Sequence, residues 1–374
     1  MGGRASGFKL RRTAITLFPM VLCVLVLASR VARNGTYFGL DFNLFQPDGR
    51  FYLWEAYRFL GKSDSQAWGQ VTSFYQHLHL VSTHYTSSIS PLNDLGLRRD
   101  INSRPLYPLL SVPFVVIMGG AGMLVIPILC LTASCYLVVF SFRDDQRKFI
   151  AFAGFAVLST SPFFLRGFFS NYTDPLLALL VLIAFILLRQ GYQNVWVLFF
   201  LSLLGEATRP SEPLWIVIFL LFFIATKKRR FLFLTLFHVI FLGCIAILTP
   251  DSVGSSTRGG YSPLVRVFDF VPHVLKILII DISEIAILDK ILFSFLAIYL
   301  ISIVRVRRKR LDYVALLLLM TTFAMSAWNG AVGTGWRYEL PSFCPILITL
   351  IDRIPEKWVN LMDTRILRWS RGKP

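Results

Sequence analysis

Long apolar runs recur along this chain, and they constrain its fold more than any other feature. They cover about 17–25 residues each, the length that an α-helix needs to cross a hydrocarbon core of about 30 Å. Only 16% of the residues are charged, and 55% are hydrophobic, whereas soluble domains carry about 25% charged residues. The sequence therefore predicts an all-α fold, a polytopic bundle of transmembrane helices.

Lys and Arg gather in short segments between the runs, at 143–148, 227–230 and 305–310. Because such clusters mark cytoplasmic loops, we predict about ten spans with both termini in the cytoplasm, which puts the whole net charge of +17 on that side. The expected spans are 13–29, 121–142, 149–165, 175–188, two short spans within 195–226, 231–248, one ending at 305, 314–327 and 340–354.

Residues 105–142 decide this topology. Their 38 residues would suffice for two spans, but two spans would move the basic clusters at 227–230 and 305–310 to the outer side, against the positive-inside rule. We therefore expect a half-inserted helix at 105–118 followed by one span. The chain then forms a single membrane domain, 1–374, in which residues 30–120 are the first outer loop and contain that half-inserted helix.

Three acidic residues are candidates for chemistry on the outer side, where carboxylates at a membrane boundary are functional candidates by default. Asp41 and Asp48 lie in the segment Asp-Phe-Asn-Leu-Phe-Gln-Pro-Asp-Gly, and Asp174 precedes Pro175 at the start of a span. Each has a plain structural interpretation too. Pro-Asp-Gly is a turn signal, and an Asp at a helix start is a favourable N-cap.

Two basic residues are candidates at the same side. Arg209 lies between the two short spans of 195–226, and Arg337 lies just before the last span. An arginine at a membrane boundary either extends its head group to water or presents a fork of donors to a phosphate. Nucleic acid is excluded as a partner, because the basic residues follow the pattern of cytoplasmic loops.

Metal ligation is not predicted. The histidines His77, His79 and His84 fit no ligand signature, and the five cysteines lie in apolar runs without ligand spacing. No cofactor is predicted, and a role for a divalent cation in catalysis is left open.

Short motifs in a fixed order carry a resemblance to a known superfamily. They are Pro47-Asp48-Gly49-x-x-Tyr52 after the first span, Arg-Pro-Leu-Tyr-Pro at 104–108, Asp174-Pro175 at a span start and Arg337-Tyr338-x-x-Pro before the last span. This order resembles the GT-C superfamily of polyprenyl-phosphate-dependent glycosyltransferases, to which lipid A aminoarabinose transferases and protein O-mannosyltransferases belong. One departure is that Gly49, and not a second acid, follows Asp48.

The resemblance implies an enzyme that transfers a sugar from a polyprenyl-phosphate donor to a glycan, lipid or protein acceptor on the non-cytoplasmic side of a membrane, with a bacterial inner membrane as the expected location. Asp48 would be the general base. Acceptor or sugar orientation falls to Asp174, Asp41 and Tyr52, and binding of the lipid phosphate to Arg337, Arg209, Arg104 and Tyr338.

Other classes share part of this pattern. A multi-span transporter or flippase would place ionisable residues in the middle of its spans and break helices in matched halves, but here the charges collect at the span ends. A surface-polysaccharide polymerase uses the same compartment and lipid carrier. A membrane scaffold without catalysis would leave the outer acids unexplained.

Overall fold

The computed structural model describes residues 36–37, 40–41, 49–77, 90–93, 98, 101–168, 172–192, 194–248, 263–305, 310–329 and 336–356. Helices dominate this part of the chain, so the predicted all-α fold is confirmed; two short strands, β1 (Thr36–Tyr37) and β2 (Leu40–Asp41), pair antiparallel. The helices are α2 (Gly49–Phe59), α3 (Asp64–His77), α6 (Leu106–Met118), the 3-10 helix η1 (Gly119–Leu124), α7 (Val125–Phe140), α8 (Asp145–Leu158), α9 (Pro162–Phe168), α10 (Asp174–Arg189), α11 (Val195–Thr208), α12 (Glu212–Thr226), α13 (Arg229–Leu248), α14 (Pro263–Leu288), α15 (Lys290–Arg305), α16 (Arg310–Asn329) and α17 (Trp336–Asp352).

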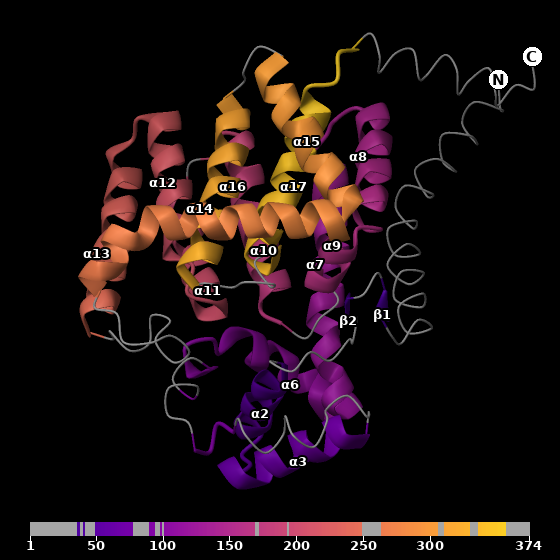
Figure 1. Ribbon diagram of the computed structural model, residues 1–374, viewed down its shortest axis with the longest axis vertical. Helices are drawn as coiled ribbons and strands as arrows, with labels where there is room; N and C mark the ends of the chain where they lie inside the picture. The colour runs from indigo at the N-terminus through magenta and orange to yellow at the C-terminus, as the bar shows by residue number, and fades with distance from the viewer. Residues whose placement is uncertain are drawn as a thin grey trace, which may run out of the picture.

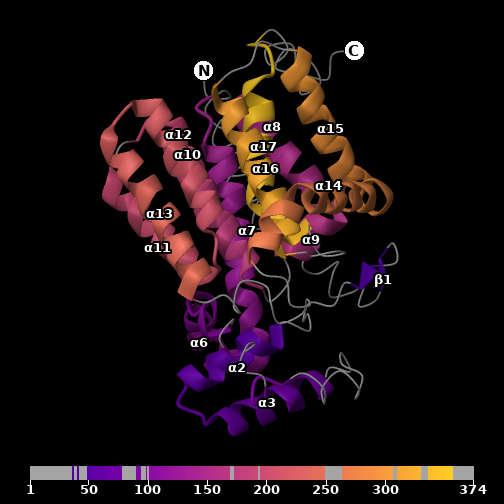
Figure 2. The same cartoon turned by 60° about the vertical axis from the view of Figure 1, so that its left-hand side comes forward.

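The helices form two parts, a small lobe and a larger bundle (Figures 1 and 2). The lobe consists of α2, α3 and the start of α6, and the remaining helices form the bundle. In the bundle, α10 and α17 pack against each other near the centre, and α10 buries most of its apolar side chains. The lobe corresponds to part of the predicted first outer loop.

One nearly continuous helical stretch, α6–η1–α7, joins the lobe to the bundle (Figure 2). At η1 the chain tightens over Gly-Gly-Ala-Gly, and Gly119 adopts a positive φ of 59°. A Cβ on Gly122 would lie 2.3 Å from the backbone of Phe114, so only glycine permits this approach. The predicted boundary between the half-inserted helix and the following span thus lies at η1.

The span predicted at 149–165 is not a single helix. It divides into α8 and α9, which meet at an angle of 92°. Asp289, which separates α14 from α15, accepts hydrogen bonds from the Ser161 hydroxyl at 2.5 Å and from the Phe163 amide at 2.9 Å. These bonds satisfy polar groups that the bend exposes, so a carboxylate distant in sequence stabilises the break.

A second difference concerns the outer segment predicted at 249–272. The helix α14 already begins at Pro263 and continues through the predicted amphipathic stretch to Leu288. In Figure 1 α14 lies across the bundle, roughly perpendicular to α12, α16 and α17. The Gly/Ser/Thr composition predicted a loop, but it ends before Pro263, where apolar residues return in helical spacing.

The count of ten spans stays a prediction. Among the described residues, one helical stretch, Leu106–Phe140, is long and apolar enough to cross a membrane, and the α8–α9 pair would be a second if its two bent halves are joined. Four shorter apolar helices, Val195–Thr208, Glu212–Thr226, Lys290–Val304 and Asp312–Ser326, fall below that length. The predicted first span, 13–29, lies outside the described residues.

Candidate functional site

Two of the predicted residues, Asp174 and Arg209, meet in a buried ion pair. Asp174 is the first residue of α10, where Pro175 follows it, and Arg209 is the extended residue that ends α11. A guanidinium nitrogen of Arg209 donates to Oδ1 of Asp174. Both side chains are almost fully buried. Thr173 occupies the N-cap position of α10 and Asp174 is the first helical residue, so the predicted N-cap role of Asp174 is not what the structure shows.

The corner between α11 and α12 holds Arg209 in place. The Ser211 amide donates to Glu206 at 3.1 Å, and the Trp215 indole donates to the Ser211 hydroxyl at 3.0 Å. Gly205 allows the indole of Trp215 to approach closely, since a Cβ there would lie 2.4 Å from the ring. The break predicted at 207–212 is thus confirmed, and it is a tightly packed corner.

Two further predicted residues, Tyr52 and Arg104, also contact each other. Arg104 Nη1 lies 3.0 Å from the Tyr52 hydroxyl oxygen and donates to it. Tyr52 is buried on α2, with its ring edge-on to Tyr107 of α6 at 5.6 Å between centroids. The two residues are 52 positions apart, so the lobe brings together the start of the half-inserted helix and the segment that follows Asp48.

The helix α6 connects the two pairs. It packs against α2, which carries Tyr52, and against α11, which ends at Arg209. The helix that carries Tyr52 and the helix that ends at Arg209 therefore both contact α6, which extends from the lobe to the bundle (Figure 1). Of the other predicted site residues, Asp48 lies outside the described residues, and Asp41, Arg337 and Tyr338 lie in described elements whose side chains at these positions are outside the description.

Sequence reasoning missed one acidic residue near this end of the bundle, Glu339. It lies in the first turn of α17 and its side chain has no exposed surface, and neither carboxyl oxygen has a hydrogen-bond partner among the residues that the structure describes. Asp281 on α14 accepts a hydrogen bond from Ser326 of α16 at 2.9 Å. The sequence Arg-Tyr-Glu-Leu-Pro does place an acid just before an apolar run, which marks a candidate functional residue. The neighbouring Arg337 was chosen as the candidate there instead.

Carboxyl groups crowd around Glu339. Burial, followed by the negative charges of Asp281 and Glu284, raises the pKa of Glu339 well above its usual range. Burial also raises the pKa of Asp281 to about 6, with the charge of Glu284 adding to it and the hydrogen bond from Ser326 opposing it. Asp281 and Glu284 lie on α14, and Glu339 lies in the first turn of α17, so this acidic cluster joins the two helices.

We predict that rising pH destabilises the protein through this cluster. Because the folded-state pKa values of Glu339 and Asp281 exceed those of the unfolded chain, about 4, their stabilisation is complete at low pH. It is lost as the pH rises through the folded-state pKa of each group, which is about 6 for Asp281 and well above the usual range for Glu339. Thermal unfolding in detergent between about pH 4 and 8 should show this fall, and Glu339→Gln should flatten it. The exposed Glu356→Gln should leave the slope unchanged. An unaltered slope in Glu339→Gln would contradict the prediction.

The opposite end of the bundle has a different electrostatic character. Arg189, at the end of α10, donates through Nε to Asp352 at 2.9 Å and through Nη1 to the Ser141 carbonyl at 2.5 Å. Arg353 donates through Nε to Asp312 at 2.8 Å. Here arginines link the ends of four helices, and the basic turn between α12 and α13 lies at the same end in Figure 1.

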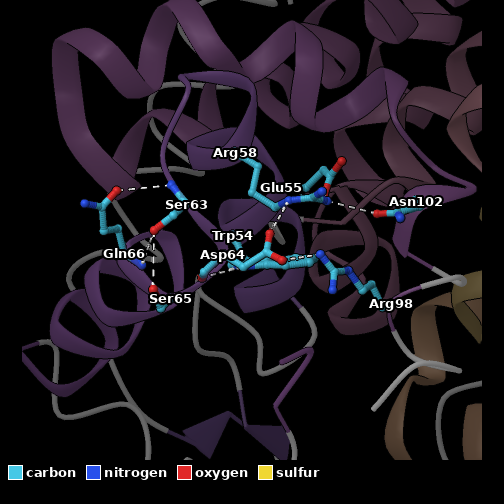
Figure 3. A network of polar contacts seen from close by, with 9 residues as sticks. All are labelled: Trp54, Glu55, Arg58, Ser63, Asp64, Ser65, Gln66, Arg98 and Asn102. Carbon is cyan, nitrogen blue, oxygen red and sulfur yellow. Dashed lines mark hydrogen bonds and ion pairs between the residues drawn. The ribbon is translucent and has the colours of Figure 1, made fainter. Parts of the chain in front are cut away.

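Inside the lobe, a polar network fixes α2 against α3 (Figure 3). Asp64 forms ion pairs with Arg58, at 2.8 Å from its Nε, and with Arg98, and both guanidinium groups lie over the Trp54 ring. The Trp54 indole donates to the Asp64 carbonyl at 3.1 Å, and Arg58 also donates to Glu55 at 2.7 Å. The network orients α2, on which Tyr52 lies.

Asp64→Asn is expected to destabilise the lobe by about 1 kcal/mol, because partly exposed ion pairs contribute about 0.2–1 kcal/mol each. Limited proteolysis should then cut between α2 and α3 at lower protease concentration than in the wild type. Lys62→Gln, which changes one charge in the same lobe, is the matched control. Equal cleavage of Asp64→Asn and wild type would show that the network does not hold the lobe.

Metal binding finds no support in the part of the chain that the structure describes, since no three His, Cys, Asp or Glu residues there are arranged to hold an ion. Comparison with known proteins found no matching family model, no matching curated protein and no matching solved structure. The functional argument therefore depends on this chain's own residues.

Proposed function

We propose that the protein is an integral membrane glycosyltransferase of the GT-C type. It transfers a sugar from a polyprenyl-phosphate donor to an acceptor on the non-cytoplasmic side of a bacterial plasma membrane. The observation that carries the proposal is that Asp174 meets Arg209 and Tyr52 meets Arg104, while α6 packs against both α2 and α11. These residues come from distant motifs, and the proposal requires them to share one site.

The membrane part of the proposal draws on the surface of the bundle. Large apolar side chains lie exposed on its outer helices, among them Ile117 (80% exposed), Val304 (79%) and Phe233 (70%). Exposed apolar surface on this scale marks an interaction surface, and a bilayer is the partner that surrounds a bundle on several faces. The basic α12–α13 turn at one end and the lobe at the other fit about ten spans with an outward-facing site.

The chemistry is a single displacement at the anomeric carbon. The acceptor hydroxyl gives its proton to the Asp48 carboxylate, and its oxygen forms the new bond to the anomeric carbon. The bond from that carbon to the phosphate oxygen breaks, and polyprenyl phosphate leaves with the electron pair. The anomeric configuration is inverted.

The ion pair between Asp174 and Arg209 decides which residues we assign to the phosphate and which to the sugar or acceptor. Because Arg209 is held by Asp174, we assign stabilisation of the leaving phosphate mainly to Arg337 with Tyr338, and to Arg104. Asp174 and Arg209 together shape the floor of the site, and Tyr52 and Asp41 orient the sugar or acceptor. Donation from Arg104 to the Tyr52 hydroxyl links the phosphate and sugar groups of this arrangement.

A direct assay tests the proposal. The purified protein in phospholipid vesicles is mixed with a panel of polyprenyl-phosphate sugars, and release of polyprenyl phosphate and appearance of glycosylated acceptor are followed by mass spectrometry. Cell fractionation establishes membrane location in the same preparation. Turnover of one donor supports the proposal. A protein that sits in the membrane and turns over none of the donors, but moves one of them across the bilayer, would instead be a flippase.

A further inference from the structure

Helix α14 differs from its neighbours in direction and in the distribution of its side chains. It lies across the bundle, and Figures 1 and 2 agree on this orientation. The other helices around it run along the long direction of the bundle. A helix in this position in a membrane protein runs parallel to the bilayer plane, whereas its neighbours run across it.

The side of α14 that faces the bundle carries the buried acid Asp281. Asp281 and Ile285, which are one turn apart, are buried, and Asp281 contacts Ser326 near the end of α16. This side also faces the buried carboxyl of Glu339, whose pKa responds to Asp281 and Glu284. The described inward side of α14 thus packs against the bundle, and Asp281 Oδ1 has no hydrogen-bond partner among the described residues.

The outward side of α14 is mostly apolar and has no cover within the described part of the chain. Leu275, Ile279 and Ile282 follow one another at spacings of four and three residues and are 53%, 64% and 42% exposed, so they form one stripe. Ile287 is 72% exposed. Two polar residues, Lys276 and Ser283, are exposed on the same outward side.

We propose that α14 is an in-plane helix seated at the boundary between the acyl chains and the head groups of a phospholipid bilayer. The apolar stripe enters the acyl boundary, and the Lys276 ammonium reaches the head-group phosphates. This inference depends on the membrane location in the proposed function. It adds that α14 sets the depth at which Asp281 and Glu339 lie, and so the level of the candidate site relative to the lipid phosphates.

Spin-label depth measurements test this placement. Single cysteines replace either Leu275 or Ala286, which lie on one stripe of α14, in a protein whose native cysteines are changed to alanine. A matched pair of label sites with the same spacing lies on α13. These sites are Phe233, replaced by cysteine, and the exposed native Cys244, which is kept only for its own label. Each labelled protein is placed in vesicles of phosphatidylcholine and phosphatidylglycerol, and depth is read from the relative accessibility to oxygen and to a nickel chelate.

The two helices should give opposite results. At a rise of about 1.5 Å per residue, each pair is separated by about 16 Å along its helix. We expect the α13 labels to differ in depth by nearly that distance, and the α14 labels to differ by less than about a third of it, both at the head-group boundary. Lys276→Gln should move the α14 labels little in vesicles of phosphatidylcholine alone, and outward when anionic lipid is present.

Three outcomes would overturn the inference. If the two labels on α14 differ in depth as much as the two labels on α13, α14 is a spanning helix. Labels on α14 that are open to the nickel chelate would place the stripe in water, and labels shielded from both reagents would mean that another protein surface covers it. If the α13 labels also lie outside the lipid, the membrane location itself fails, and with it the proposed function, which separates that failure from an error about α14.

Discussion

Asp48→Asn should lower the rate of sugar transfer by about 10²- to 10⁴-fold, the usual contribution of a general acid or base. The amide has nearly the shape of the carboxylate, but it cannot accept the proton of the acceptor hydroxyl. The loss should therefore appear in kcat, with little change in KM for the donor. Single-turnover transfer in vesicles measures it directly, together with the pH profile, whose acidic limb should vanish in the variant.

A matched substitution separates chemistry from structure. Asp251→Asn makes the same change of charge on the predicted outer side and should keep the wild-type rate. Detergent-solubilised Asp48→Asn should elute and unfold like the wild type, since only the chemistry is removed. If Asp48→Asn transfers sugar at the wild-type rate, Asp48 is not the general base, but the proposal that the protein is a transferase still stands.

Arg209→Ala should destabilise the protein by about 3–5 kcal/mol, the usual cost of leaving one partner of a buried ion pair without its counter-charge. The carboxylate of Asp174 is almost fully buried, so water cannot replace the guanidinium. Unfolding by denaturant in mild detergent measures the change. The double variant Asp174→Asn with Arg209→Gln should recover much of the loss, because it leaves no buried charge behind.

A less buried ion pair provides the comparison. Lys148 and Asp145 are neighbours on one face of α8, 2.8 Å apart, and Asp145 is 41% exposed. Lys148→Ala should cost no more than about 1 kcal/mol. If Arg209→Ala costs no more than Lys148→Ala, the ion pair between α10 and α11 does not stabilise the site, and Asp174 is free to take another role.

The helices themselves could be predicted from the sequence because apolar length and helix-breaking residues act locally. The break before Glu212 and the helix that begins beside Pro175 are of this kind. Asp174 and Arg209 could be chosen singly, since a charge at a membrane boundary is rare enough to be noticed. That they form a pair could not be predicted, because nothing in either motif encodes the packing of α10 against α11.

Contacts between distant segments explain the failures. The bend between α8 and α9 depends on Asp289, more than a hundred residues away, so the apolar run at 149–165 gave no sign of it. Glu339 was overlooked because its importance comes from complete burial next to Asp281.

The stretch α6–η1–α7 links the lobe to the far end of the bundle through one nearly continuous helix. It begins in the lobe beside Tyr52, passes the close contact between Gly122 and Phe114, and ends next to Ser141, whose carbonyl is bound by Arg189 at the far end of the bundle. A tilt of the lobe would be transmitted along this stretch to the arginines that link the helix ends at the opposite end of the bundle. A change at the lobe would thereby be sensed at that end without any ligand passing between them.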